Sequence, residues 1–148
     1  MSFGRGGPRP GAGRPVSKRR NKIVLHRRRQ CITRRTPAHV TLRVHRELVS
    51  LRTQGRAKVV RAAIAAVCAR DGLRVIDWSI QGNHVHLVVE ADDNAMLSRG
   101  MQGLCIRVAR GLNRLAGRKG AVFTERYHLR LLCTPTEVRN ARAYVLNN

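Results

Sequence analysis

One short run with two histidines constrains the fold of this chain more than any other segment. Residues 82–90 read GNHVHLVVE, and their β-branched and aliphatic residues predict a β-strand over residues 83–91. Side chains alternate between the two faces of a strand, so His84 and His86 share one face. If the sheet has one open face, the two histidines would lie on it, because residues suited to a core, namely Val85, Leu87 and Val89, take the other face.

Two imidazoles side by side on a rigid strand can supply half of a metal site. By itself the pair is a weak signal, because most such pairs bind no metal. Its meaning depends on what the rest of the chain places opposite it.

The remaining patterns predict an α+β fold. The order of elements is strand, helix, strand, strand, helix, strand, helix, which is a ferredoxin-like βαββαβ unit with an added C-terminal helix. We expect an antiparallel sheet with two long helices on one face and the last helix across the open face. The other strands are expected at residues 39–44, 73–80 and 123–133, and the helices at residues 58–71, along the apolar stripe from Leu97 to Leu115, and from Pro135 onward.

The charge of the chain indicates a polyanionic partner. It has 30 Lys and Arg against 8 Asp and Glu, a net charge of +22, which is typical of nucleic-acid binding. Residues 1–35 are rich in Gly, Pro and Arg and cannot build a core, so we predict a disordered basic arm there and a globular domain over residues 36–148. The arm either contacts DNA or is a solvated tail; its candidate DNA contacts are Arg14, Arg19 and Arg20.

Other features narrow the class of protein. Aromatic residues make up only 3% of the chain, too few for a base-stacking surface as the main binding mode. No long apolar span or signal peptide is present. The four cysteines form no C-x-x-C pair, which fits a reducing compartment, so we expect a cytoplasmic, nucleoid-associated protein.

The C-terminal helix has a clear start signal and carries a second set of polar groups. Thr134, Pro135 and Glu137 form a predicted capping box. Tyr144 and Asn148 are four residues apart, so they share a helix face. Facing the two imidazoles, they would complete a set of three metal ligands and one nucleophile.

At this point a family resemblance is visible. GNHVHLVVE, ERYHLRLL and TPTEVRNARAYVLNN resemble the single-tyrosine HUH transposases of insertion sequences, most closely the REP-associated branch, from about residue 37 to the end. The resemblance implies a single-stranded DNA endonuclease and strand transferase that uses Mg²⁺ or Mn²⁺ and a 5′-phosphotyrosine intermediate. It assigns His84 and His86 to the HUH motif, Tyr144 to the nucleophile and Asn148 to the third metal ligand.

The resemblance also implies a hairpin-forming DNA partner and a monomer or a homodimer. The tyrosine helix of the family commonly continues through Asn-Pro and a basic segment, whereas this sequence ends at Asn148, which predicts a truncated, weakly active copy. Tyr127 is a second possible nucleophile, but its strand position predicts a core residue. Arg126, His128 and Arg130 share a strand face and are expected to contact DNA phosphates, a solvated charged face being the alternative.

Two other functions compete with this one. A non-catalytic nucleic-acid-binding module, such as a domesticated transposase, would bind DNA without cutting it. A histidine-triad nucleotide hydrolase is disfavoured, because its third histidine would fall at Val88. The sequence assigns no role to His26, His39 or His45.

Overall fold

Four strands form one antiparallel sheet in the order β2-β3-β1-β4, which confirms the ferredoxin-like prediction. The computed structural model describes residues 31–48, 50–69 and 72–147. The predictions for Arg14, Arg19, Arg20 and Asn148 therefore lie outside the described residues. The elements are β1 (Ala38–Arg43), α1 (Gln54–Cys68), β2 (Leu73–Ile80), β3 (His84–Ala91), α2 (Asn94–Leu115), β4 (His128–Leu131) and α3 (Pro135–Asn147).

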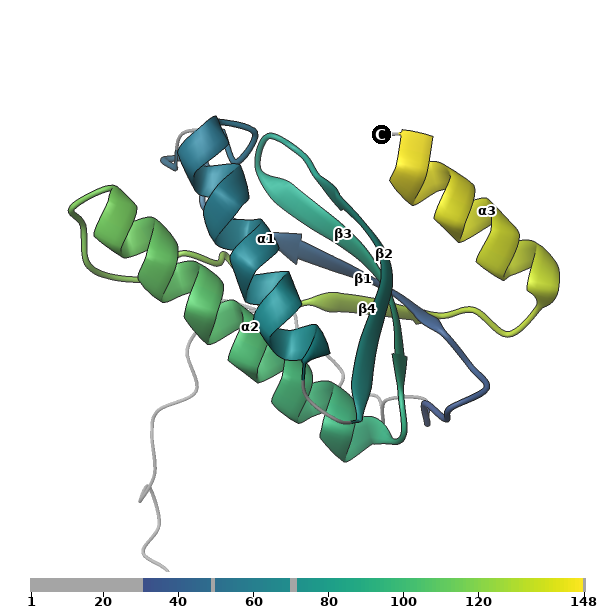
Figure 1. Ribbon diagram of the computed structural model, residues 1–148. Coiled ribbons are helices and arrows are strands. Elements are labelled where there is room, and N and C mark those ends of the chain that lie inside the picture. Colours follow the sequence, from purple (N-terminus) through teal and green to yellow (C-terminus); the bar gives the residue numbers. More distant parts are fainter. Residues whose placement is uncertain (1–30, 49, 70–71, 148) are drawn as a thin grey trace, which may run out of the picture.

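Helices α1 and α2 cover one face of the sheet, and α3 lies on the other (Figure 1). The main core lies between the sheet and the two long helices. It is built from the inward residues of the strands and from one stripe of each helix. The stripe of α2 is fully buried and consists of Leu97, Met101, Leu104, Val108 and Leu112.

The predicted capping box starts α3. The Glu137 carboxylate accepts hydrogen bonds from the backbone N–H groups of Cys133 (2.9 Å) and Thr134 (3.1 Å). In return, the Thr134 hydroxyl accepts from the Glu137 N–H at 3.2 Å. The Cys133 N–H, the Arg130 guanidinium and the Thr134 N–H together lower the pKa of the Glu137 carboxyl. The first turn of α3 is therefore fixed at the end of β4.

A small apolar cluster docks α3 on the open face of the sheet. Val145 of α3 packs against Val88 of β3 and Leu132, which follows β4, and all three are buried. Arg142 Nε donates to the Asp77 carboxylate of β2 at 2.5 Å. These contacts set where the last turns of the helix lie over the sheet.

The fourth strand is shorter than predicted, and Arg126 is not on it. Thr41 pairs with His128, so a continuous ladder would pair Val44 with residue 125, but Val44 instead bridges Phe123. Two extra residues are thus accommodated in a bend over residues 124–126. Phe123 and Tyr127 both pack against the core from either side of this bend, which confirms the packing role predicted for Tyr127.

Residues 31–35, at the end of the predicted arm, contact the domain. Ile32 is buried in the core, and its N–H donates to Asn94 Oδ1 at the start of α2. Arg34 donates to Asp92 at 2.6 Å. The packed region thus reaches back at least to Ile32.

Candidate active site

Strand β3 carries the two imidazoles side by side on the open face of the sheet. The ring centroids of His84 and His86 lie 4.7 Å apart with the planes nearly perpendicular. Both neighbours of β3 are hydrogen-bonded strands, so its backbone is held from both sides. The pair therefore lies on one of the two central strands of the sheet.

The His84 ring is oriented by the residue before it. Its Nδ1 lies 2.8 Å from Asn83 Oδ1, an acceptor, so Nδ1 carries the proton and Nε2 keeps its lone pair. Partial burial, and then the positive charge of Arg43, lower the pKa of His84. The ring is therefore a neutral imidazole at neutral pH.

The His86 ring is buried, with only 6% of the residue exposed. Its Nδ1 lies 3.2 Å from His39 Nε2 and 3.2 Å from Thr41 Oγ1. Its Nε2 is buried and has no hydrogen-bond partner. Burial, followed by the charges of His84 and His39, lowers the pKa of His86 to about 4. A neutral ring with an unpartnered nitrogen has the chemistry of a metal ligand.

Helix α3 brings Tyr144 to the same place. The Tyr144 ring meets His86 edge-on at a centroid distance of 5.2 Å and lies 6.1 Å from His39. Tyr144 is 52% exposed, so a large substrate can reach it. The groove between α3 and the sheet is lined by His39, His86, Arg130, Leu132, Glu137, Asn140, Ala141 and Tyr144.

His39 is the member of this group that sequence reasoning missed. It lies on β1, in alternation with Thr41 and Arg43, and stacks on His86 at 5.2 Å between centroids. Burial, and then the charges of His128 and Arg130, lower its pKa. Its phase along β1 was the available signal, because residues in phase with Thr41 face the open side.

The DNA-contact candidates divide into three groups. His128 and Arg130 of β4 are exposed and pair in register with Thr41 and His39, so they stand beside the site. Arg130 also donates to Glu137 at 3.1 Å. Arg126 is exposed in the bend before β4 rather than on the strand face. The candidates of the arm lie outside the described residues.

The residues present fit a metal with two imidazole ligands. Within residues 31–48, 50–69 and 72–147, no three His, Cys, Asp or Glu side chains gather as a metal-binding group. The buried Nε2 of His86 and the unprotonated Nε2 of His84 are donors suited to a divalent ion. Further ligands must then come from an amide, from water or from a substrate phosphate.

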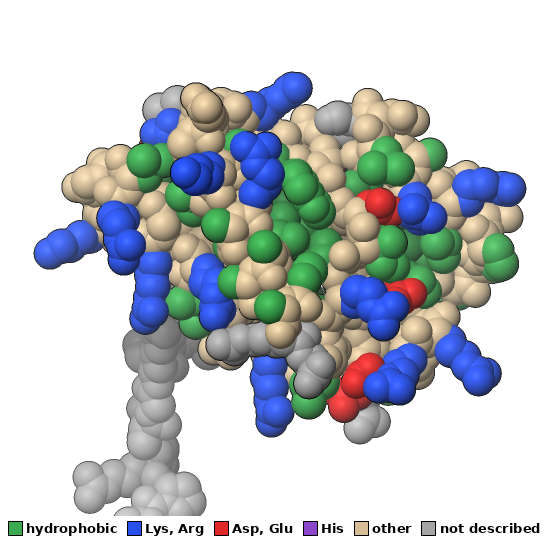
Figure 2. All heavy atoms as spheres, viewed as in Figure 1, with side chains coloured by type: hydrophobic (Ala, Val, Ile, Leu, Met, Phe, Trp, Pro, Cys, Tyr) green, Lys and Arg blue, Asp and Glu red, His purple; other side chains and the backbone are tan. Residues whose placement is uncertain are grey.

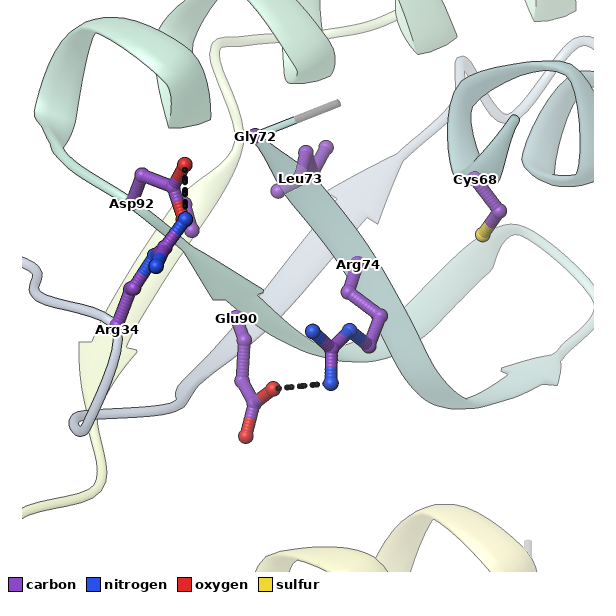
Figure 3. Close-up of a pocket in the computed structure, with 8 residues that line it drawn as sticks. Arg34, Cys68, Gly72, Leu73, Arg74, Glu90 and Asp92 are labelled. Atoms are coloured by element: carbon purple, nitrogen blue, oxygen red, sulfur yellow. Dashed lines mark hydrogen bonds and ion pairs between the residues drawn. The ribbon is translucent and has the colours of Figure 1, made fainter. Parts of the chain in front are cut away.

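A second hollow lies at the far end of β2 and β3 (Figure 3). Its charged side chains are already paired, Arg34 with Asp92 and Arg74 with Glu90. Acidic groups elsewhere on this face are paired as well: in the space-filling view they lie beside Lys or Arg side chains, while other Lys and Arg side chains stand apart (Figure 2). This hollow therefore offers no concentrated charge to bind a ligand.

Comparison with known proteins points to one family. A family model described as "Transposase IS200 like" matches residues 25–148. Comparison with curated proteins gives no significant match. In the part of the chain that the structure describes, no helix is both long and apolar enough to cross a membrane.

Two solved structures share the fold. One is a REP-associated tyrosine transposase bound to a REP hairpin, with a TM-score of 0.63 and 16% identity over 80% of this chain and 68% of that one. The other is a candidate transposase from Deinococcus radiodurans R1, with a TM-score of 0.54 and 14% identity over 75% of this chain and 88% of that one. At these identities the likeness concerns the fold.

Proposed function

Because this chain belongs to the IS200-like transposase family, we propose that it cuts and rejoins single-stranded DNA with Tyr144 as nucleophile. One observation carries the proposal. Helix α3 holds the Tyr144 ring 5.2 Å from the ring of His86, on the sheet face that also carries His84. A phenol next to two neutral imidazoles in a basic protein is suited to phosphate chemistry.

In the proposed reaction, the Tyr144 phenol oxygen attacks the phosphorus of a DNA phosphodiester. The new bond joins that oxygen to phosphorus, and the bond from phosphorus to the 3′ oxygen breaks. The phenol proton passes to water, which reaches the exposed Tyr144, and the departing 3′ oxygen takes a proton to become a 3′-OH. The products are a 5′-phosphotyrosine and a free 3′-OH, and because the covalent link keeps the bond energy, rejoining needs no ATP.

The two histidines would act on the phosphate through a bound metal ion. His84 and His86 would bind Mg²⁺ or Mn²⁺ through their Nε2 atoms, with Asn148 as the proposed third ligand. When bound, such an ion withdraws negative charge from the phosphate oxygens. The imidazoles suit this role because their lowered pKa values favour the neutral form, which has a lone pair to offer a metal ion.

The strand next to the site provides the path for the DNA. Helix α3 packs on β2 and β3, so the half of the open face over β1 and β4 remains accessible to a nucleic acid. His128 and Arg130 face that side, and we propose that they contact backbone phosphates, with Arg126 at the edge. The partner is proposed to be single-stranded DNA with a hairpin, by analogy with the hairpin in the structure of the similar REP-associated transposase.

The test is formation of a covalent protein–DNA adduct. The protein is incubated with Mn²⁺ and a single-stranded DNA that forms a hairpin, taken from the genomic sequence on either side of its gene. Adducts are resolved by denaturing electrophoresis. The wild type should form an adduct that is lost in Tyr144→Phe and kept in Tyr127→Phe. His84→Ala and His86→Ala should each form no adduct, even when Mn²⁺ is present.

Two outcomes would contradict the proposal in different ways. An adduct that persists in Tyr144→Phe would show that another residue is the nucleophile. Tight DNA binding with no adduct on any flanking substrate would favour the non-catalytic binding module.

A further inference from the structure

We propose that His39 and Thr41 of β1 fix His86 in the tautomer that presents its buried Nε2 to a metal ion. The inference rests on the proposed function, because it concerns the same site. It gives β1 a positioning role in a centre whose expected ligands come from β3 and α3. It also explains why a strand next to the ligands carries a third histidine.

The contacts converge on one atom. His86 Nδ1 lies 3.2 Å from His39 Nε2 and 3.2 Å from Thr41 Oγ1. Thr41 is directly opposite His86 in the β1–β3 ladder, and His39 is its diagonal neighbour. The His39 and His86 rings also stack with 27° between their planes. Strand β1 therefore contacts the His86 ring both at Nδ1 and across its face.

The contacts favour the Nδ1–H tautomer of His86 over the Nε2–H tautomer. A neutral imidazole carries one N–H, and both His39 Nε2 and Thr41 Oγ1 can accept a hydrogen bond. A proton on His86 Nδ1 is donated to one of them, which leaves the Nε2 lone pair available. A proton on Nε2 instead would be a buried donor with no acceptor, which proteins avoid.

The neighbouring ligand is held in the same way. His84 Nδ1 donates to Asn83 Oδ1 at 2.8 Å, so its Nε2 is also the free nitrogen. Each imidazole of the pair thus has its own partners at Nδ1: His84 has Asn83, in the turn before β3, and His86 has His39 and Thr41 of β1. Such partners fix the ring and its tautomer in metal sites, and losing one typically weakens metal binding about 10- to 100-fold.

The first experiment measures Mn²⁺ affinity without DNA. Free Mn²⁺ is followed by electron paramagnetic resonance while the full chain is titrated. His39→Leu should bind Mn²⁺ about 10- to 100-fold more weakly than the wild type. His39→Gln should stay close to the wild type, because its amide oxygen can still accept from Nδ1, and the double variant with Thr41→Val should be weaker than His39→Leu.

His45→Gln is the matched control for the loss of a histidine outside this contact, and thermal melting checks that each variant is folded. Equal affinity in all variants would overturn the inference and leave the proposed function intact. Absence of Mn²⁺ binding by the wild type would overturn both.

A second measurement requires no variant. Long-range ¹H–¹⁵N correlation spectra of the metal-free wild type report which ring nitrogen of His86 carries the proton. We expect the Nδ1–H form. Observation of the Nε2–H form would overturn the inference, whereas a shift toward a tautomer mixture in His39→Leu would support it further.

Discussion

The docking of α3 leads to a prediction about how the site opens. The helix is attached by a small cluster, with Val145 1% exposed at its centre, and by the Arg142–Asp77 ion pair. The main core lies on the other face of the sheet. We expect α3 to detach in a local transition at lower free energy than global unfolding, and Tyr144 to leave the site with it.

The perturbation is Val145→Ala. It removes two methyl groups, each worth about 0.8 kcal/mol of transfer free energy, and leaves a small cavity, for a total of about 2 kcal/mol. At 1.36 kcal/mol per factor of ten, hydrogen-exchange protection of the α3 amides should fall about 30-fold. Residue-resolved exchange by NMR measures this.

Val108→Ala is the matched control, because Val108 of α2 is also buried, at 2% exposed. Val108 stays packed when only α3 detaches, so this variant changes the native and the α3-open states equally. Protection of α3 should therefore be unchanged in Val108→Ala, while protection of the α2 amides falls. If Val108→Ala lowers α3 protection as much as Val145→Ala does, the helix opens only with the whole domain and the reasoning is refuted.

Two further predictions concern packing and pH. Gly111→Ala should lower the melting temperature, because a Cβ there would lie 2.4 Å from Val59 Cγ1, an overpacking that typically costs about 1–3 kcal/mol. Gly103→Ala, whose Cβ would meet only the end of the long Arg107 side chain, should be neutral or stabilising by up to about 1 kcal/mol. The folded-state pKa of Glu137 is lowered, so its stabilisation of α3 is present above the unfolded pKa of about 4.3 and is lost as pH falls through the folded pKa. Exchange protection of α3 should thus be weaker at about pH 3 than at pH 6, and Glu137→Gln should reduce that difference.

Two results would contradict these predictions. A Gly111→Ala variant as stable as the wild type would mean that α1 and α2 separate at little cost. If α3 exchange protection in Glu137→Gln falls with pH as much as in the wild type, other carboxylates cause the acid sensitivity of α3.

Local patterns predicted the elements that depend on neighbouring residues. The alternation of residues 83–91 placed His84 and His86 on the open face, and the capping box placed the start of α3. The bend before β4 was not predictable, because it arises from a bridge between Val44 and Phe123, far apart in the sequence. Alternation could predict the face that His39 occupies, but its contact with His86 depends on the register between β1 and β3.

That register links the site to the core. Leu87, between His86 and Val88, is completely buried, and the same pleat that buries it turns the imidazoles outward. A slip of β3 by one residue would turn both histidines toward the main core and move Leu87 to the opposite face, so it would disrupt the core as well as the proposed ligand pair. A change of strand register would therefore disturb the imidazole pair and the core together, whereas Tyr144, on a helix held by a few contacts, can leave the sheet while the rest of the domain stays folded.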